Sequence, residues 1–371
     1  MVHFGVGVIG ATGFIGTPYR AEIRAASDDA RIVALCGRRH DLLEKAAIVD
    51  GADVVTTDWR EVVGNSDVNL VVVAVPDVLH HEIVMACASA GKHVVCEKPV
   101  ATTAMQAEEM WLAYRQSGLG HFVPFWTRGI RVFQKAHDVV ANGILGEIRA
   151  FVYRWHNPRP ASMPLTWRDD AQLSTAGSVG DGGSHAYDTL RWLTGLEVHR
   201  LLAHADVIAP PKADLGAVNL DEALKWAADH STAKSSATAP RKGTAFDYGV
   251  VATELENGAV GVFVLSHAPY VRIGLMPDLE LHGDKASLAV DKTAGVLRLV
   301  RSGREPEILE TFQETEGLNR FSGQVFPAIR AHAAGRHTDE PGLHDGWRVQ
   351  IFTDAAVASA KRGTWITTAE L

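Results

Sequence analysis

Residues 4–16 read FGVGVIGATGFIG, a short apolar run that is followed by three glycines spaced three residues apart. The run Phe4–Ile9 is rich in valine, as expected for a strand buried on both faces, and Thr17–Ala26 has apolar residues at helical spacing. Glycines between a strand and a helix let the backbone approach a pyrophosphate, which then binds the amides at the helix start. The alternative is a plain packing turn. The stretch favours a dinucleotide site whose loop residues are Gly10, Thr12, Gly13, Phe14 and Ile15.

Strand-like and helical segments alternate through the first third of the chain. Further short Val/Ile-rich runs are Arg31–Cys36, Leu70–Val75 and His93–Cys96. Helical patterns lie between and after them, at Leu42–Ala47, His80–Ala90 and Thr103–Ser117. This alternation predicts an α/β domain with a parallel sheet and helices on both faces.

The second strand ends in Gly37-Arg38-Arg39, with no acidic side chain at its tip. A site specific for NAD usually offers a carboxylate there to the ribose hydroxyls, whereas two arginines can hold a 2′-phosphate. The alternative is that one arginine covers the adenine ring and the other is solvated. We expect NADP or NAD as the cofactor, with a slight preference for NADP.

The character of the sequence changes near residue 125. A helical pattern at Val132–Asn142 precedes the expected strand Ile148–His156, which carries aromatic residues at alternate positions. The later strand-like runs are Val250–Leu255, Val260–Leu265, Leu279–His282, Ser287–Val290 and Val296–Val300. Asn257-Gly258 between the first two indicates a hairpin, so this second sheet should be largely antiparallel. Residues 210–245 interrupt the pattern and are interpreted as an insertion.

Composition limits the classes of function. The 371 residues include 36 basic and 44 acidic side chains, for a net charge of −8, which argues against nucleic acid or an anionic membrane surface as partner. The start of the chain does not resemble a signal peptide, and three cysteines are too few for a disulfide scaffold, so we expect a cytoplasmic protein. His80, His81 and His93 have no accompanying carboxylate cluster or cysteine pair, so no metal site is expected.

Two further motifs identify a family resemblance. They are Ala74-Val75-Pro76-Asp77-Val78-Leu79-His80 with Cys96-Glu97-Lys98-Pro99, and Asp181-Gly-Gly-Ser-His185. Together with the glycine loop, they resemble the Gfo/Idh/MocA family of sugar and cyclitol oxidoreductases. The resemblance implies an N-terminal Rossmann domain with a doubly wound parallel sheet (residues 1–124). It also implies a C-terminal α+β domain with a large, mainly antiparallel open sheet (residues 125–371).

The resemblance also implies roles for individual residues. Lys98 would orient the reacting hydroxyl, His185 would act as acid/base, and Asp181 would bind hydroxyls or assist the proton path. Histidine suits proton transfer near neutral pH, although Asp181 could equally cap a helix. The remaining expected cofactor contacts are Gly37, Arg38, Arg39, Val75, Pro76, His80, Glu97 and Lys98. The expected substrate contacts are Lys98, Arg128, His156, Trp167, Arg168, Asp181 and His185.

These expectations describe an NAD(P)-dependent dehydrogenase acting on a secondary hydroxyl of a monosaccharide, anhydrosugar, cyclitol or sugar derivative. Two alternatives remain open: an NAD-dependent glycosidase that uses transient oxidation, and a non-catalytic sugar sensor that keeps the dinucleotide site. The resemblance further implies a homodimer or homotetramer.

Overall fold

The computed structural model describes residues 3–216, 218–230, 239–312, 319–336 and 338–371, and the chain divides into two compact units. The first unit comprises Met1–Pro124, Asn219–Asp221 and Glu316–Gln350. The second comprises Phe125–Val218, Glu222–Thr315 and Ile351–Leu371. The first cut lies where the sequence predicts it, after residue 124, but the contiguous assignment of 125–371 to one domain does not hold for residues 316–350.

Ion pairs explain why this late segment belongs to the first unit. Arg320 pairs with Glu22, and the Arg330 guanidinium lies 2.7 Å from the Asp29 carboxylate. Both acidic residues belong to or follow the first helix of the chain. The late segment forms a π-helical turn, Phe321–Val325, and helix α9, Phe326–Ala333.

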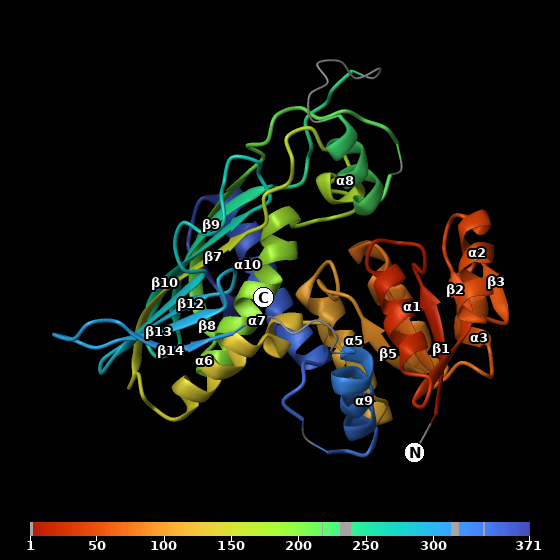
Figure 1. Cartoon of the computed structure of the whole chain (residues 1–371), viewed down its shortest axis with the longest axis horizontal. Helices are drawn as coiled ribbons and strands as arrows, with labels where there is room; N and C mark the ends of the chain where they lie inside the picture. The colour runs from red at the N-terminus through yellow and green to blue at the C-terminus, as the bar shows by residue number, and fades with distance from the viewer. Residues whose placement is uncertain (1–2, 217, 231–238, 313–318, 337) are drawn as a thin grey trace. The chain divides into compact units, whose positions relative to one another are not determined.

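The first unit is built on a six-stranded parallel sheet (Figure 1). Its strands, in the order β3-β2-β1-β4-β5-β6, are Val54–Thr56, Ala30–Cys36, Phe4–Ile9, Leu70–Val73, His93–Cys96 and His121–Phe122. The helices are α1 Gly16–Ala25, α2 His40–Asp50, α3 Trp59–Gly64, α4 His80–Ser89 and α5 Ala104–Ser117. Right-handed crossovers place α1 and α2 on one face and α3, α4 and α5 on the other. The prediction of a doubly wound Rossmann sheet is confirmed.

Local sequence accounts for these elements. Every residue of β1 and β4 is buried, as strands covered by helices on both faces require. Thr103 caps α5, accepting a hydrogen bond from the Gln106 amide. Strand β4 ends at Val73 rather than Val75, although the Ala74 amide still donates a hydrogen bond to the Ile9 carbonyl oxygen of β1, at 2.9 Å.

The second unit contains a nine-stranded sheet in the order β14-β13-β12-β11-β7-β10-β9-β8-β15. In that order the strands are Glu307–Thr311, Val296–Val300, Ser287–Asp291, Leu279–Gly283, Ile148–His156, Val260–Ser266, Tyr248–Leu255, Val198–Asp206 and Ile366–Thr367. Only β10 and β7 pair in parallel, so the prediction of a mainly antiparallel sheet is confirmed. The associated helices are α6 Arg131–Ala141, α7 Gly177–Thr194, α8 Leu220–Asp229 and α10 Leu343–Arg362.

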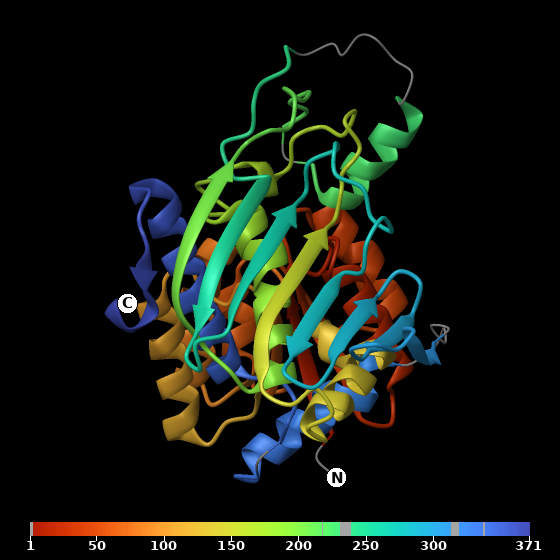
Figure 2. The same ribbon diagram turned by 90° about the vertical axis from the view of Figure 1, so that its left-hand side faces the viewer.

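One face of this sheet packs on helices α6 and α7 (Figure 2). The alternate aromatic residues of β7 point to this face: Phe151 and Tyr153 are buried, and both lie against Phe263 of β10. The alternate aromatic residues Phe151, Tyr153 and Trp155 thus form one packed face of the sheet. The aromatic core fixes the position of α7, which carries Asp181 and His185.

The insertion leaves and re-enters the sheet between neighbouring strands. Asp206 at the end of β8 pairs with Tyr248 at the start of β9, so the chain between them is an excursion from a continuous sheet. The insertion contains the helix α8. Residues 217 and 231–238 of the insertion lie outside the described residues.

Candidate active site

The glycine loop packs so closely that two of its glycines are required by the loop itself. Gly10 has a φ of 88°, and a Cβ there would overlap the carbonyl oxygen of Ala74. A Cβ on Gly16 would overlap the carbonyl oxygen of Gly10. These two residues therefore set the tight turn from β1 into α1.

The third glycine borders the start of α1. The nearest atom to a Cβ on Gly13 would be the Gly10 carbonyl oxygen, at 3.2 Å. The helix N-cap is Ile15, which provides no side-chain cap, and the first turn of α1 has no acidic residue. Thr12 and Ile15 are half-buried and Phe14 is exposed. The loop thus has the features of a pyrophosphate-binding helix start: uncapped amides, the positive end of the helix dipole and no competing carboxylate.

The end of β2 lies beside this loop. A Cβ on Gly37 would be 3.5 Å from the Thr12 hydroxyl oxygen, so the two segments are in contact. Arg38 and Arg39 follow and are exposed. Two exposed arginines therefore follow the end of β2, which contacts the glycine loop through Gly37 and Thr12.

The ends of β4 and β5 are joined by His80, the first residue of α4. Its Nδ1 lies 2.8 Å from the Pro99 carbonyl oxygen, and its Nε2 lies 2.9 Å from the Val75 carbonyl oxygen. The side chain is 1% exposed, and burial lowers its pKa. This geometry favours a supporting role behind the strand ends over the direct cofactor contact that the sequence analysis expected for His80.

Glu97 and Lys98 follow β5 directly. The buried Glu97 carboxylate accepts hydrogen bonds from the Tyr19 hydroxyl of α1 and from the Lys98 amide, the latter at 3.2 Å. The Lys98–Pro99 peptide bond is cis, and the Lys98 side chain is half-buried. Since β1, β4 and β5 are neighbours, the glycine loop, Val75-Pro76 and Glu97-Lys98 meet at one edge of the sheet. The carboxyl edge of such a sheet is where ligands bind.

Within the second unit, His185 is held by aromatic rings. The imidazole stacks on Trp155 of β7 at a centroid distance of 5.0 Å and an interplanar angle of 15°. The Phe125 ring meets the imidazole in a T-shaped arrangement, with a centroid distance of 6.3 Å. A Cβ on Gly182 would lie only 2.7 Å from Trp155 Cδ1. Because glycine has no side chain, the indole can pack directly against α7. Sequence spacing placed His185 and Asp181 on one helix but did not identify Trp155 and Gly182 as partners.

Asp181 lies one turn before His185 and has two partners that sequence reasoning missed. Its Oδ2 is 3.3 Å from Arg159 Nη2 and 3.2 Å from His267 Nε2, and both partner side chains are buried. Asp181 is thus held by buried cationic or hydrogen-bonding groups rather than serving as the N-cap of α7, which is Ala176. Arg159 and His267 come shortly after the ends of strands β7 and β10. Their position just beyond a predicted strand is the sequence feature that could have identified them as site residues.

Trp167 and Arg168 lie in a short 3-10 turn that the insertion holds in place. The Arg168 guanidinium lies 4.4 Å from the Trp167 ring centroid. Asp169 accepts hydrogen bonds from the Thr166 amide and hydroxyl, and its Oδ1 is 2.7 Å from the buried Lys212 ammonium. The Asp169 carbonyl also accepts hydrogen bonds from the amides of residues 244 and 245. Both ends of the insertion therefore contact this turn.

Two expected substrate residues, Arg128 and His156, have partners within the second unit. The buried Arg128 guanidinium binds Asp188 through two hydrogen bonds, at 2.9 Å and 2.5 Å, which favours a structural role. His156 follows Trp155 in β7, so its side chain points to the opposite face of the sheet, where Nδ1 lies 3.3 Å from the Arg272 carbonyl oxygen. The structure brings Trp155 to His185, whereas His156 contributes to the lining of an adjacent pocket.

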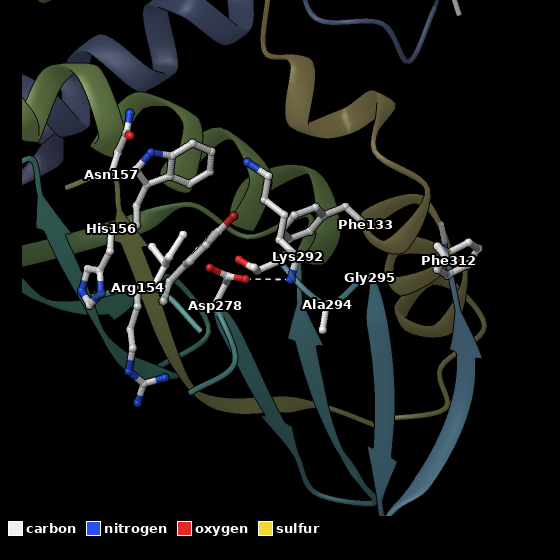
Figure 3. A pocket seen from close by; sticks show the side chains of 13 residues that line it. Phe133, Arg154, His156, Asn157, Asp278, Lys292, Ala294, Gly295 and Phe312 are labelled. Atoms are coloured by element: carbon white, nitrogen blue, oxygen red, sulfur yellow. Dashed lines mark hydrogen bonds between the residues drawn. The ribbon is translucent and has the colours of Figure 1, made fainter. Parts of the chain in front are cut away.

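A pocket of ≈ 650 Å³ borders the aromatic wall at the ends of β7 and β12 (Figure 3). Its lining includes Trp155, Asn157, Asp278, Lys292 and Phe312. The Lys292 amide donates a hydrogen bond to Asp278, and the Lys292 ammonium lies 5.0 Å from the Trp155 ring centroid. Burial raises the pKa of Asp278.

Among the described residues, no group of three or more His, Cys, Asp or Glu side chains could hold a metal ion. All three cysteines are buried and unpaired with one another. In the described part of the chain, no helix has the length and hydropathy needed to cross a membrane.

Comparison with known proteins agrees with this geometry. The model described as "Oxidoreductase family, NAD-binding Rossmann fold" matches residues 4–125, and "GFO/IDH/MocA C-terminal domain" matches residues 133–289. Levoglucosan dehydrogenase of Pseudarthrobacter phenanthrenivorans is 26% identical, covering 88% of this chain and 86% of its own. Myo-inositol 2-dehydrogenase of Thermotoga maritima is 28% identical, covering 92% of this chain and 90% of its own.

A solved oxidoreductase domain protein from Kribbella flavida is 26% identical, with a TM-score of 0.83 over 99% of this chain and 100% of its own. Both family models together span most of the sequence, and the glycine loop and strand-end residues lie within the first. The chain therefore belongs to the Gfo/Idh/MocA family of NAD(P)-binding oxidoreductases.

Proposed function

We propose that this protein is an NAD(P)-dependent dehydrogenase that oxidises a secondary hydroxyl of a monosaccharide, anhydrosugar, cyclitol or related sugar derivative. The observation that carries the proposal is the presence of two groups suited to this chemistry: half-buried Lys98 at the carboxyl end of β5 and half-buried His185 on α7. The relatives named as levoglucosan and myo-inositol dehydrogenases support the same substrate class.

Each group has a defined task in such an oxidation. A dinucleotide held by the glycine loop would supply a hydride acceptor for the carbinol carbon. His185 takes the hydroxyl proton as a general base, while the Lys98 ammonium orients the hydroxyl oxygen and stabilises the negative charge that develops on it. Asp181 binds a neighbouring hydroxyl or assists the proton path, and Arg159 and His267 keep its carboxylate in place. The proposal requires Lys98 and His185, from different units, to reach one hydroxyl.

The same proposal extends to the cofactor. The glycine loop residues Gly10, Thr12, Gly13, Phe14 and Ile15 would hold the pyrophosphate, and Val75, Pro76 and Glu97 border the strand ends beside it. Arg38 and Arg39 are exposed at the tip of β2, which supports a preference for NADP over NAD. Comparing kcat/KM with the two cofactors tests this preference, and a clear preference for NAD contradicts it.

A panel of sugars, anhydrosugars and cyclitols, assayed by absorbance of the reduced nicotinamide, tests the function. We expect net cofactor reduction with at least one compound. Lys98→Ala should lose most turnover yet still bind NAD(P)H, because Lys98 acts on the alcohol rather than on the phosphates. His185→Ala should lose the alkaline plateau of the pH–rate profile. Substrate cleavage without net reduction would indicate an NAD-dependent glycosidase, and near-native turnover of Lys98→Ala would contradict the assigned role.

A further inference from the structure

The pocket beside Trp155 is larger than a single sugar ring needs. Its volume of ≈ 650 Å³ lies within the usual range for sites that enclose a small organic ligand. At about 30 Å³ for each water molecule in the liquid, it equals the volume of roughly twenty waters, whereas one pyranose has about a dozen non-hydrogen atoms. The space is therefore large enough for a complete sugar ring.

The pocket begins at the side chain that contacts His185. Trp155 stacks on His185 at 5.0 Å and also forms part of the pocket wall. The Lys292 ammonium lies 5.0 Å from the centroid of the same indole ring. Lys292 and His185 are therefore both close neighbours of Trp155. Since Trp155 is common to both, the separation of His185 and Lys292 is within the reach of a two-ring substrate.

The polar groups around the pocket suit hydroxyls rather than an anion. Lys292 and Asn157 provide hydrogen-bond donors, and Asn157 and Asp278 provide acceptors. A bound anion would be repelled by Asp278, and the nearby Arg154 cation is neutralised by Glu280 at 2.6 Å. A neutral ring with several hydroxyls can use donors and acceptors together, and the aromatic rings of Phe133 and Phe312 suit its C–H faces.

We propose that this pocket is a subsite for a second, non-reacting ring, so that the substrate is a glycoside whose one ring is oxidised at His185 while the other contacts Lys292. The inference rests on the proposed function and narrows its substrate class from single-ring sugars to two-ring glycosides. It adds a site to the second unit that the catalytic residues do not themselves define.

Two lysines at the opposite ends of β12 provide a matched test. Lys292 follows the strand and lines the pocket, whereas the exposed Lys285 precedes the strand and does not. The assay compares kcat/KM for a monosaccharide, its methyl glycoside and disaccharides that contain it. Wild-type protein should prefer a disaccharide. Lys292→Met should lower kcat/KM for the disaccharide by about tenfold or more, as expected for a lost charge-assisted hydrogen bond. The methyl glycoside should change less than twofold, and Lys285→Met should change neither.

Other outcomes separate this inference from the proposed function. Oxidation of single-ring sugars with no gain for disaccharides, or an equal loss for both in Lys292→Met, overturns the second-ring subsite and leaves the function standing. If no sugar of either size is oxidised, the proposed function fails, and calorimetric titration of the disaccharides into the NADH-bound protein then decides the subsite. Binding weakened by Lys292→Met but not by Lys285→Met supports it, and absent or unaffected binding overturns it.

Discussion

Gly13 and Gly16 stand in one loop, yet a methyl group added at each would meet different surroundings. At Gly13 the nearest atom is the Gly10 carbonyl oxygen at 3.2 Å, whereas at Gly16 the methyl group overlaps that oxygen. We expect Gly13→Ala to weaken NAD(P)H binding at least about tenfold while the protein stays folded, because the methyl group occupies the pyrophosphate cradle. Gly16→Ala should instead reduce the free energy of unfolding by about 1–3 kcal/mol through overpacking.

Fluorescence titration of NAD(P)H together with thermal unfolding separates the two effects. Gly64→Ala is the control, because nothing lies within 4 Å of a Cβ at that position. If Gly13→Ala bound NAD(P)H as tightly as the wild-type protein, the prediction that the glycine loop holds the pyrophosphate would be wrong.

The buried His121 ring makes the first unit sensitive to acid. It stacks on His332 at 4.1 Å, and its Nδ1 accepts a hydrogen bond from the Leu343 amide. Burial lowers the pKa of His121 to about 3, while an unfolded histidine has a pKa of about 6.5. Between these values the unfolded chain binds more protons, so the stability of the fold decreases as the pH falls through 6.5 toward 3.

His121→Asn should therefore flatten the dependence of stability on pH. From pH 6.5 to pH 5, protonation of this one residue in the unfolded state accounts for about 2 kcal/mol. Denaturant unfolding of wild type and variant at both pH values measures the difference. Parallel pH profiles would show that His121 is not buried as described.

Among the elements, the insertion depends on one buried ion pair. Lys212 and Asp169 are 2.7 Å apart with side-chain exposures of 7% and 11%, and Asp169 belongs to the turn that carries Trp167 and Arg168. We expect Lys212→Met to reduce the free energy of unfolding by about 3–5 kcal/mol, because it leaves a buried carboxylate without its cation. Amide exchange at residues 244 and 245, which bond the Asp169 carbonyl, should accelerate.

Lys212→Arg should restore much of the lost stability because it keeps the charge. Arg241→Gln breaks the exposed Arg241–Asp214 pair in the same insertion and should change stability by only a few tenths of a kcal/mol. Equal effects of the two neutral variants would indicate that Lys212 does not hold the turn.

Elements with strong apolar patterns were predicted closely. Phe4–Ile9, His93–Cys96, Ile148–His156 and Val296–Val300 are observed with the expected bounds. Strand β8, Val198–Asp206, was missed because its histidines and arginine obscure the alternation. The edge strand β14, Glu307–Thr311, was missed because three of its five residues are exposed and two are glutamates. Whether such a segment forms a strand depends on how it packs against neighbouring strands, which the local sequence does not show.

The site was predictable only as far as local motifs reach. The glycine loop, Glu97-Lys98 and the Asp181–His185 spacing lie within short stretches of sequence, and the structure places each at a strand end or on one helix. The partners Arg159, His267 and Trp155 are brought to α7 by sheet register, which no local pattern encodes.

For the whole molecule, the wide sheet of the second unit predicts self-association. Figure 2 looks onto the face turned away from α7. Because side chains alternate along a strand, Val152, Val250, Val262 and Val264 point away from the face that carries the buried Phe151, Val251 and Phe263, and each of the four valines is half-buried. A broad apolar face of this kind marks an interface between subunits. Light scattering should give the mass of two or four chains, and Val264→Glu should lower it. A mass near the 40.0 kDa of one chain would contradict the prediction.

The division into units was only partly predictable. A change in composition marks the boundary after residue 124, but the return of residues 316–350 rests on pairs such as Glu22 with Arg320, which are far apart in sequence. Contacts between such distant charged residues leave no periodic signal.

The most direct test of the account is a crystal structure of the protein with NAD(P)H and a sugar that it oxidises. We expect one substrate hydroxyl to lie within hydrogen-bond distance, about 3 Å, of both the Lys98 ammonium and the His185 imidazole, with its carbon facing the nicotinamide. A sugar bound with these two groups directed away from the reacting carbon would contradict alcohol oxidation at this site.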